Sequence, residues 1–470
     1  MRRLASLLLC LALATGQAAD LPAPVQRVLT GHGIVPADVS ILVQEVGATE
    51  PVLSHLADTP RNPASVMKLL TTWVALEVLG PAYTWPTEIY FGGDFDGRAL
   101  HGDLAIKGYG DPFLVVEEFW KMLRVLRRLG LEDIQGDLLL DDTYFDVAED
   151  HPGAFDGEPY RTYNVVPSAL MANFKAVRFQ FFADPRSGRV NVATDPVLAN
   201  LDIRNRIELV EGPCRGFQAG ISFNVDDAET LACIVFEGEF SRSCNAYTLS
   251  RTVLDHDTYV HGLFEALWDE LGGNLRGGLR KGAVPENHRR VVTWHSPPLS
   301  DVIRSINKNS NNVMTRHLVY TLAAEIAGPP ATRAAGVDVI GEFLARRGLD
   351  VESLVLVNGA GLSREERISA RLLVDLLHEA QRSPYAAEYV SSFSLGGLDG
   401  TTRGRFNGAG NGRMHVKTGR LDHVSALAGF LHAHDGREYV VAIFGNFTDA
   451  HRGLGQELET AVVNWVYALP

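Results

Sequence analysis

The spacing of apolar and polar residues predicts helices near both ends of the chain and short strands in the middle. A helix is expected over residues 25–33, a strand over 38–46, and a long apolar helix from Ser65 to about Leu79. Beyond Trp85 the pattern changes, because apolar and polar residues alternate over short segments, as they do in half-buried strands.

This strand-rich character lasts to about His288 and is interrupted by helix-like segments at 119–130 and 259–273. From about Pro297 the helical periodicity returns. Near the C-terminus we expect three apolar strands and a final helix, at 414–419, 425–433, 438–446 and 455–469. The strand-rich block thus lies between two regions in which helices predominate.

Ser65 and Lys68 are the strongest candidates for catalysis. They lie three residues apart at the expected start of the apolar helix, so both side chains fall on one helix face. A serine hydroxyl becomes a nucleophile when a base removes its proton, and a lysine is such a base if burial or a nearby cation lowers its pKa. A second pair with this spacing, Ser305 and Lys308, shows that the spacing alone is weak evidence.

Two further motifs favour Ser65. Ser-Asn-Asn at 310–312 and Lys-Thr-Gly at 417–419 follow it in the order found in serine acyl-transferases that bind penicillin. The first motif precedes the strand-rich block and the other two follow it. One catalytic domain is therefore expected to form from both ends of the chain, with a large insertion between them.

This arrangement sets the expected domain boundaries. The catalytic domain is placed at 20–85 and 290–470, and the insertion is interpreted as two nested modules. Its outer module is expected at 86–165 and 254–289, and its inner module at 166–253. Because all three motifs lie outside the insertion, we expect the insertion to guide the substrate rather than to take part in the chemistry.

The first 19 residues have the features of a secretory signal peptide. Arg2 and Arg3 form a positive start, a short apolar run extends from Leu4 to Leu13, and small residues near Ala19 offer a cleavage site. That run is too short to span a bilayer, and no other run reaches about 18 apolar residues, so no transmembrane anchor is expected. We predict an exported, periplasmic protein without a lipid anchor.

The overall charge argues against nucleic acid as a partner. The chain carries a formal net charge of −14 at pH 7, whereas nucleic acids and anionic lipids are bound by basic surfaces.

Export also bears on the cysteines, because an oxidising compartment permits disulfides. Removal of the signal segment leaves Cys214, Cys233 and Cys244. Two strands around a turn near Asp226 would bring Cys214 within loop reach of Cys244 and would place Cys233 in mid-strand as a small hydrophobic residue. A Cys214–Cys244 disulfide is therefore favoured.

With these motifs the chain resembles class C low-molecular-mass penicillin-binding proteins, the D-alanyl-D-alanine carboxypeptidase/endopeptidase family of penicillin-binding protein 4, peptidase family S13. The resemblance covers nearly the whole mature chain and includes the long insertion, which β-lactamases lack. It also includes the segments YGDPFL (109–114), QGDLLLDDTYF (135–145), YNVVPSALMANF (163–174), VNGAGLSREERIS (357–369) and GLDGTTRGRF (397–406).

The resemblance implies an α+β fold, with a penicillin-binding/β-lactamase-like catalytic domain made of an antiparallel sheet covered by helices and with a large β-rich two-module insertion. It implies periplasmic cleavage of D-alanyl-D-alanine and of D-alanyl crosslinks in peptidoglycan peptides. β-Lactam antibiotics are the implied inhibitors, and neither a cofactor nor a metal is expected.

The resemblance also implies a role for each motif residue. Ser65 would be the acylated nucleophile and Lys68 its base. Ser310 would relay a proton toward the leaving group, and Asn312 would hold Lys68 and the substrate amide. Lys417 would supply electrostatic attraction.

The remaining expected site residues concern substrate binding. Thr418 is expected to bind the terminal carboxylate, and Gly419 to leave the strand edge open to a close-lying substrate. The negative charge that develops on the carbonyl oxygen needs fixed donors, which the backbone N–H groups of Ser65 and Arg420 would supply.

Two residues depart from the common family pattern. Asn311 stands where many members have aspartate, and its side chain is expected to point away from the reaction. Arg420 stands where a small or hydroxyl residue is commoner, and it adds a cation near the carboxylate site. That cation would either strengthen the binding of substrates that end in a free C-terminal carboxylate or narrow the cleft.

Other signals are weaker. NGAGNG at 407–412 lacks the strand–loop–helix context of a phosphate site and is interpreted as a surface turn. Asp150-His151 and Asp255-His256-Asp257 lack metal-ligand spacing and are expected in solvated loops. VNGAG at 357–361 either lines the cleft or only shapes a loop.

Two alternative functions remain open. A β-lactamase would use the same three motifs, but it has no evident use for the insertion. A non-catalytic wall-binding protein would not need Ser65, Lys68, Ser310 and Lys417 to be intact.

Overall fold

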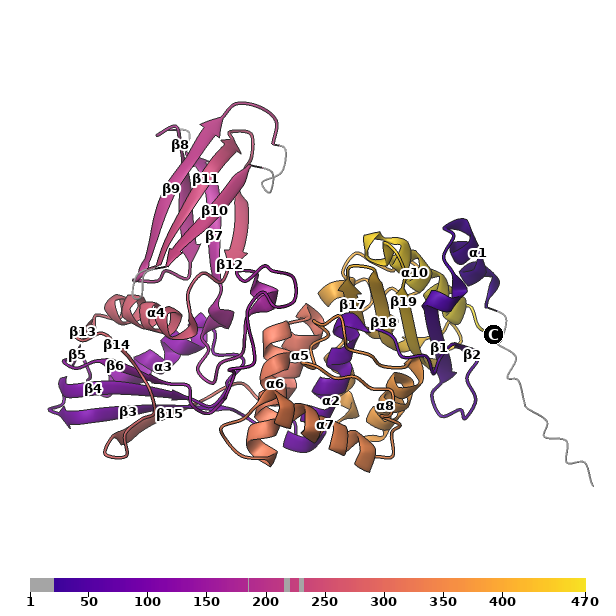
Figure 1. Cartoon of the computed structure of the whole chain (residues 1–470), viewed down its shortest axis with the longest axis horizontal. Coiled ribbons are helices and arrows are strands. Elements are labelled where there is room, and N and C mark those ends of the chain that lie inside the picture. The colour runs from indigo at the N-terminus through magenta and orange to yellow at the C-terminus, as the bar shows by residue number, and fades with distance from the viewer. Residues whose placement is uncertain (1–20, 185, 215–219, 228–231) are drawn as a thin grey trace, which may run out of the picture.

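The computed structural model describes residues 21–184, 186–214, 220–227 and 232–470, so the expected signal peptide lies outside the described residues. The helices and sheets form two bodies joined near the middle of the molecule (Figure 1). None of the helices in the described part of the chain combines the length and apolar character that crossing a lipid bilayer requires.

A six-stranded antiparallel sheet is formed by both ends of the chain, with the strand order β16-β17-β18-β19-β1-β2. The N-terminal strand β1 (Val39–Glu45) pairs with the C-terminal strand β19 (Glu438–Asn446), as the indigo and yellow ribbons show in Figure 1. The other strands are β2 (Leu53–His55), β16 (Ser394–Leu395), β17 (Met414–Leu421) and β18 (Val424–His432). The expected α+β fold is confirmed.

Both faces of this sheet are covered by helices. In β1, Ile41 packs toward α1 (Ala23–Gly31) and α10 (Leu454–Tyr467), while Leu42 packs toward the opposite helical layer. Burial on both faces explains why β1 reads as a continuous apolar run rather than an alternation. The opposite layer contains α2 (Lys68–Leu79), α5 (Leu299–Asn309), α6 (Asn312–Ile326), α7 (Arg333–Arg346), α8 (Ala370–Arg382) and α9 (Ala386–Ser391).

Helix α2 runs through the centre of that layer and is buried almost all round, from Lys68 to Leu76. Its mostly apolar sequence suits this position, because a helix without a polar face belongs in a core. It ends before Gly80, whose φ of 81° is a conformation that glycine adopts readily.

The second body is built on a mixed sheet from the insertion. It contains β3 (Pro86–Phe95), β4 (Ala99–Gly108), β5 (Asp133–Ile134), β6 (Leu138–Asp141), β13 (Asn274–Leu275), β14 (Leu279–Lys281) and β15 (Arg289–His295). Helices α3 (Val116–Arg128) and α4 (His256–Glu270) accompany it. Because β15 pairs with β3, this sheet extends to His295, past the expected boundary at 289.

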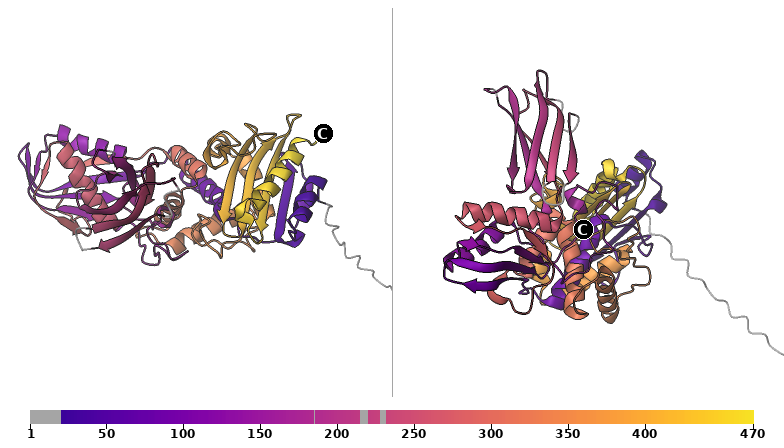
Figure 2. Two further views of the ribbon diagram at one scale, coloured as in Figure 1. Left: turned by 90° about the horizontal axis from the view of Figure 1, so that it is seen from above. Right: turned by 60° about the vertical axis from the view of Figure 1, so that its left-hand side comes forward.

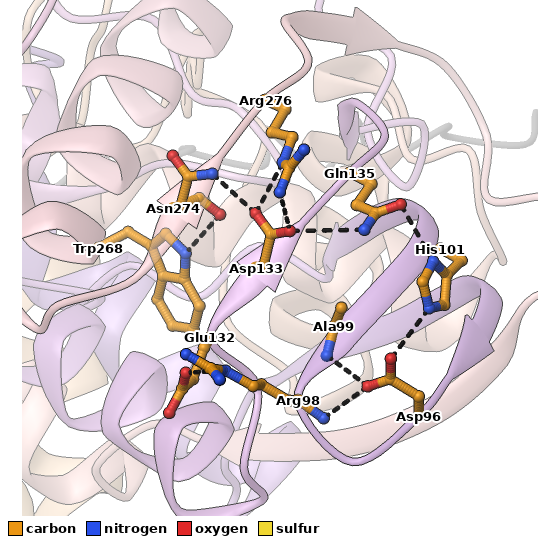
Figure 3. Close-up of polar contacts among 10 residues, drawn as sticks. All are labelled: Asp96, Arg98, Ala99, His101, Glu132, Asp133, Gln135, Trp268, Asn274 and Arg276. Atoms are coloured by element: carbon orange, nitrogen blue, oxygen red, sulfur yellow. Dashed lines mark hydrogen bonds and ion pairs between the residues drawn. The ribbon is translucent and has the colours of Figure 1, made fainter.

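A polar network fastens one end of this sheet (Figure 3). Asp133 of β5 accepts hydrogen bonds from Asn274 at 2.7 Å and from Arg276 at 2.6 Å. Gln135 continues the network from Asp133 to His101 of β4. Short strands that are far apart in sequence are thereby held together by side chains as well as by backbone pairing.

Two three-stranded sheets stand away from the rest of the insertion (Figure 2). They consist of β7 (Val177–Asp184), β8 (Arg189–Asp195) and β12 (Tyr247–Arg251), and of β9 (Leu201–Val210), β10 (Ile221–Asp227) and β11 (Ala232–Ser241). The sheets pack face to face, with Phe236 of β11 lying 5.1 Å from Phe179 and 5.0 Å from Phe181 of β7, measured between ring centroids. One buried apolar cluster joins these strands to α3, α4 and the mixed sheet, so the division into two modules stays a prediction.

The Cys214–Cys244 disulfide is confirmed, with Cα atoms 5.0 Å apart, and Cys233 is buried in β11. The expected turn position was wrong. Asp227 pairs with Ala232, so the strands connect between these two residues rather than around Asp226. The observed register sets Cys214 nearer to the level of Cys244 than a turn centred at Asp226 would.

Candidate active site

Ser65 and Lys68 are in direct contact. Ser65 lies in a 3₁₀ turn, Ala64–Met67, which leads into α2 at Lys68. Side chains three residues apart eclipse one another in a 3₁₀ helix, so the local fold itself brings the two groups together. Lys68 Nζ donates to Ser65 Oγ at 2.9 Å.

The second motif lies at the junction of α5 and α6. Ser310 follows α5 in a left-handed conformation, with a φ of 57°, and Asn312 opens α6. Lys68 Nζ donates to Asn312 Oδ1 at 2.6 Å, so the first two motifs meet at the lysine. Asn311 instead caps α6, because its side-chain oxygen accepts from the backbone N–H of Met314 at 3.1 Å.

The third motif lies on β17 beside the other two. Lys417 Nζ donates to Ser310 Oγ at 2.9 Å and to the carbonyl oxygen of Thr418 at 2.7 Å. The Thr418 hydroxyl donates to the hydroxyl of Thr401 at 2.8 Å. The five expected catalytic residues therefore form two hydrogen-bonded groups, Ser65–Lys68–Asn312 and Ser310–Lys417. The two groups lie close enough for the charge of Lys417 to lower the pKa of Lys68.

Burial sets the protonation of the two lysines. Both side chains are fully buried. Desolvation, followed by the nearby charge of Lys417, holds the pKa of Lys68 well below its usual range, and the carboxyl of Glu366 opposes this shift. Desolvation also lowers the pKa of Lys417 to about 7. Lys68 is therefore more available as a proton acceptor than an ordinary lysine.

The loop at 357–361 lines the cleft and does more than shape a turn. The carbonyl oxygen of Ala360 accepts a hydrogen bond from Lys68 Nζ. Glu366 is fully buried, and one of its oxygens accepts from the backbone N–H groups of Asn358 at 2.9 Å and Gly359 at 3.0 Å. Glu366 thereby organises the loop that presents the carbonyl of Ala360 to the lysine.

Two glycines allow the backbone to approach Ser65 closely. A Cβ on Gly361 would lie 1.9 Å from the carbonyl oxygen of Ala64 and 2.7 Å from Ser65 N. A Cβ on Gly419 would lie 2.4 Å from the carbonyl oxygen of Pro63 and 3.1 Å from Ser65 N. Both sites exclude a side chain because backbone occupies the space.

The edge of β17 is partly uncovered. The short strand β16 pairs only with His415 and Val416, so the described strands leave the edge from Lys417 onward without a partner on that side. Such an edge offers unpaired backbone groups to an extended peptide. Arg420 lies on this stretch with an exposed side chain and takes part in none of the ion pairs found in the described residues.

A residue of the insertion reaches the cluster. The side-chain amide of Asn312 donates to the carbonyl oxygen of Tyr163 at 3.2 Å. Nearby, a pocket of about 330 Å³ lies between residues 149–164 of the insertion and the loop at 357–365. Its lining includes charged side chains of both signs: Glu149, Asp150, Arg316, Arg333, Arg364 and Glu365.

The competing candidates have structural roles. Lys308 of the second serine–lysine pair donates to the carbonyl oxygen of Phe393 at 2.8 Å and to Asp399 at 2.6 Å. The expectation that Asp150 lies in a solvated loop was wrong. Its side chain is buried and is bound by Arg316 at 2.9 Å and Arg333 at 2.6 Å, because a buried carboxylate needs paired cations.

One cluster in the described residues has the composition of a metal site, namely His423, Asp449 and His451. Its hydrogen bonds argue against metal binding. Nδ1 of His451 accepts from the backbone N–H of His423 at 2.9 Å, and Nδ1 of His423 accepts from that of Asp449 at 3.0 Å. Each neutral ring must then carry its proton on Nε2, which leaves no free lone pair for a metal.

Sequence reasoning missed four contributors: Ala360, Glu366, Tyr163 and Thr401. Ala360 and Tyr163 act through their backbone carbonyls, and the use of a backbone carbonyl does not require any particular side chain. Glu366 had a detectable signal, since it lies in the quoted segment 357–369. Thr401 likewise lies in the segment 397–406.

Comparison with known proteins identifies the family of this chain. The model of the D-Ala-D-Ala carboxypeptidase 3 (S13) family matches residues 22–468. A D-alanyl-D-alanine carboxypeptidase from Actinomadura sp. (strain R39) is 29% identical over 448 residues, which cover 91% of this chain and 81% of the relative. D-alanyl-D-alanine carboxypeptidase DacB from Haemophilus influenzae is 21% identical over 401 residues, covering 84% of this chain and 82% of the relative.

Solved structures show the same fold. Penicillin binding protein 4 (dacB) from Haemophilus influenzae superposes with a TM-score of 0.79 at 21% identity, covering 95% of this chain and 99% of that chain. The predatory endopeptidase Bd0816 from Bdellovibrio bacteriovorus superposes with a TM-score of 0.55 at 16% identity, covering 91% of this chain and 93% of that chain. The chain belongs to the D-Ala-D-Ala carboxypeptidase 3 (S13) family, whose members are serine-type carboxypeptidases, and the expected resemblance is confirmed.

Proposed function

We propose that this protein cleaves both the terminal D-alanyl-D-alanine bond and the D-alanyl crosslinks of peptidoglycan peptides through an acyl-enzyme on Ser65, and that penicillin acylates the same serine. The observation that carries the proposal is the 2.9 Å contact between Ser65 Oγ and Lys68 Nζ, a buried amine with a lowered pKa. That pair supports the two requirements for a serine nucleophile, namely a base within hydrogen-bond reach and a base whose pKa is lowered, so that it gives up its own proton more readily than an ordinary lysine does.

In the proposed reaction, Ser65 Oγ attacks the carbonyl carbon of the D-alanyl bond while its proton passes to Lys68 Nζ. The backbone N–H groups of Ser65 and Arg420 stabilise the negative oxygen. Ser310, bonded to Lys417, returns a proton to the leaving amine as the carbon–nitrogen bond breaks. Water then attacks the ester and releases the shortened peptide with Ser65 restored.

The remaining motif residues bind the substrate in this proposal. Thr418 and the cationic Lys417 receive the terminal carboxylate, and Asn312 holds both Lys68 and the substrate amide. The uncovered edge of β17 receives the peptide as an added strand. Arg420 adds positive charge on the same edge, which favours substrates that end in a carboxylate.

The proposed location is the periplasm, reached through the signal peptide expected at residues 1–19. The substrate fits this location, because peptidoglycan lies outside the cytoplasmic membrane. A fusion of residues 1–19 to a reporter that is active only after export would test this part directly.

The decisive experiment incubates the purified protein with intact, crosslinked peptidoglycan and separates the products by mass. We expect released D-alanine, a fall in crosslinked species, and a penicillin mass increment confined to the Ser65 peptide. Rapid repeated hydrolysis of penicillin without peptide cleavage would instead indicate a β-lactamase. Intact muropeptides and an unmodified Ser65 would indicate a wall-binding protein without catalysis.

A further inference from the structure

A pocket of about 630 Å³ lies within the insertion, where α3 and α4 meet β7, β8 and β12. None of the three catalytic motifs contributes to its lining. Two aromatic side chains, Trp120 and Phe174, and two carboxylates, Glu117 and Glu270, are among the residues that form it. We propose that this pocket binds the glycan strand of peptidoglycan through one or two of its N-acetylated amino-sugar units.

The aromatic lining suits a sugar ring. Glu117, Trp120 and Lys121 lie on one face of α3, so the indole projects toward the pocket between polar neighbours. A pyranose ring carries C–H groups on its faces that pack well on an aromatic plane. Arg124 does not line the pocket, but its guanidinium lies over the indole of Trp120, 4.7 Å from the ring centroid. This cation–π contact restrains the orientation of the ring.

The backbone at the opposite wall is strained. Asn173, Phe174 and Lys175 are three consecutive non-glycine residues with φ values of 46°, 56° and 55°. Such left-handed residues are strained and concentrate at functional sites, where surrounding structure holds them. Here the strained turn presents Phe174 to the pocket, while the amide of Asn173 is fixed by the hydroxyl of Tyr259 at 3.2 Å.

The charges of the pocket favour a neutral ligand rich in hydrogen-bond donors. Its two cations already have partners, since Lys121 contacts Glu118 at 2.7 Å and Arg178 contacts Asp195 at 3.6 Å. Glu117 and Glu270, by contrast, form none of the ion pairs in the described residues. Two such carboxylates repel phosphates and acidic peptides and accept hydrogen bonds from hydroxyl and acetamido N–H groups.

The position of the pocket suits a polymeric substrate. It lies between structural units, where ligand sites commonly form. Phe174 also packs against a small apolar cluster that includes Val313, the residue after Asn312. This packing places one wall of the pocket next to the start of α6. The identity of the ligand as peptidoglycan glycan rests on the proposed function, because the peptide that Ser65 would cleave hangs from that glycan. Binding itself requires no catalytic residue.

The inference is tested by titrating the full-length protein with the neutral β-1,4-linked tetramer of N-acetylglucosamine, using calorimetry. We expect saturable binding that weakens about tenfold or more in Trp120→Ala, the scale of one lost aromatic contact. Glu270→Gln should weaken binding several-fold. Phe182→Ala is the control. Phe182 is an exposed aromatic residue of β7, the strand that carries the pocket residue Arg178, but Phe182 itself does not line the pocket, so this variant should bind as the wild type does.

The readouts separate this inference from the proposed function. Ser65→Ala should bind the sugar tetramer normally, and Trp120→Ala should form the penicillin adduct at the wild-type rate, which also shows that it folds. On crosslinked peptidoglycan Trp120→Ala should be slower, while its release of D-alanine from a free peptide is unchanged. No saturable sugar binding, equal binding by Trp120→Ala, or displacement of the sugar by tetralysine would overturn the inference. If Trp120→Ala fails to fold, the Glu270→Gln result decides.

Discussion

The side-chain amide of Asn312 donates to the backbone carbonyl of Tyr163 at 3.2 Å, so the insertion holds a member of a catalytic motif. The contact is part of a series along α6. Arg316 donates to the carbonyl of Val165 at 3.0 Å, and the His317 ring contacts the carbonyl of Ser168 at 2.9 Å. The insertion therefore does more than stand beside the cleft, because the segment after Tyr163 braces the helix that carries Asn312.

Lys68 and Ser65 are expected to act as one catalytic unit. Arginine at position 68 stays positively charged and does not lose a proton near neutral pH, so in Lys68→Arg penicillin acylation should fall by several orders of magnitude, nearly as far as in Ser65→Ala. Intact-protein mass spectrometry over time measures the adduct. Lys308→Arg is the matched control and should acylate at close to the wild-type rate. Wild-type acylation by Lys68→Arg would show that Lys68 is not the base.

The pH dependence of acylation is expected to be bell-shaped. Lys68 must be neutral to accept the proton, so the rate rises as pH passes upward through its lowered pKa. Lys417 must be protonated to attract the carboxylate, so the rate falls as pH rises through its pKa of about 7. In Lys417→Arg the descending limb near that pH should disappear, since arginine stays charged. An unchanged descending limb in that variant would assign it to another group.

Glu366→Gln is expected to move the ascending limb. The carboxyl of Glu366 raises the pKa of Lys68, so replacing it with a neutral amide should lower that pKa further and shift the limb toward lower pH. The glutamine oxygen still accepts from the N–H groups of the loop, but its amide N–H groups would replace a buried oxygen that has no hydrogen-bond partner among the described residues, so thermal stability should also fall. Glu366→Ala leaves those donors unpaired and should lower stability by about 1–3 kcal/mol. Denaturant unfolding combined with pH–rate profiles separates the two effects.

Gly361→Ala is expected to slow acylation on the order of 100-fold, because its Cβ would collide with the backbone of Ala64 and displace Ser65. Gly404→Ala is the matched control. Gly404 has a similar φ, 75° against 78°, but its Cβ would meet nothing within 4 Å. Both variants carry the cost of a left-handed alanine, so only the collision distinguishes them. Equal acylation rates in the two variants would contradict the proposed crowding at Ser65.

Asn311→Asp is expected to acylate at close to the wild-type rate, because either side chain caps α6 through its oxygen. Asn311→Ala removes the cap and should lower stability by about 0.5–2 kcal/mol. Thr332→Ala removes the comparable cap of α7, which bonds Ala335 N at 3.2 Å, and should cost similar stability without slowing acylation. A large loss of acylation in Asn311→Asp would mean that Asn311 takes part in the reaction.

Local pattern was enough to predict much of this protein. The apolar periodicity indicated the helices and strands of both ends, including α2 and the strands β17, β18 and β19, because burial of one or both faces leaves a direct mark on composition. The contact between Ser65 and Lys68 could also be predicted from the sequence, because residues three apart within one helical turn lie side by side. The Cys214–Cys244 pairing followed even from a misplaced turn, because loops at a hairpin end tolerate a shift of a few residues.

Only the tertiary structure decided how that pair becomes reactive. The pKa of Lys68 depends on complete burial and on Lys417, which is far away in sequence. Lys417 reaches the site because β17 belongs to the sheet in which the N-terminal strand β1 pairs with the C-terminal strand β19. The carbonyls of Ala360 and Tyr163 complete the surroundings of Lys68 and Asn312. Every residue has the same backbone carbonyl, so the amino-acid sequence does not indicate which carbonyls take part in a site. Their role becomes visible only in the folded structure.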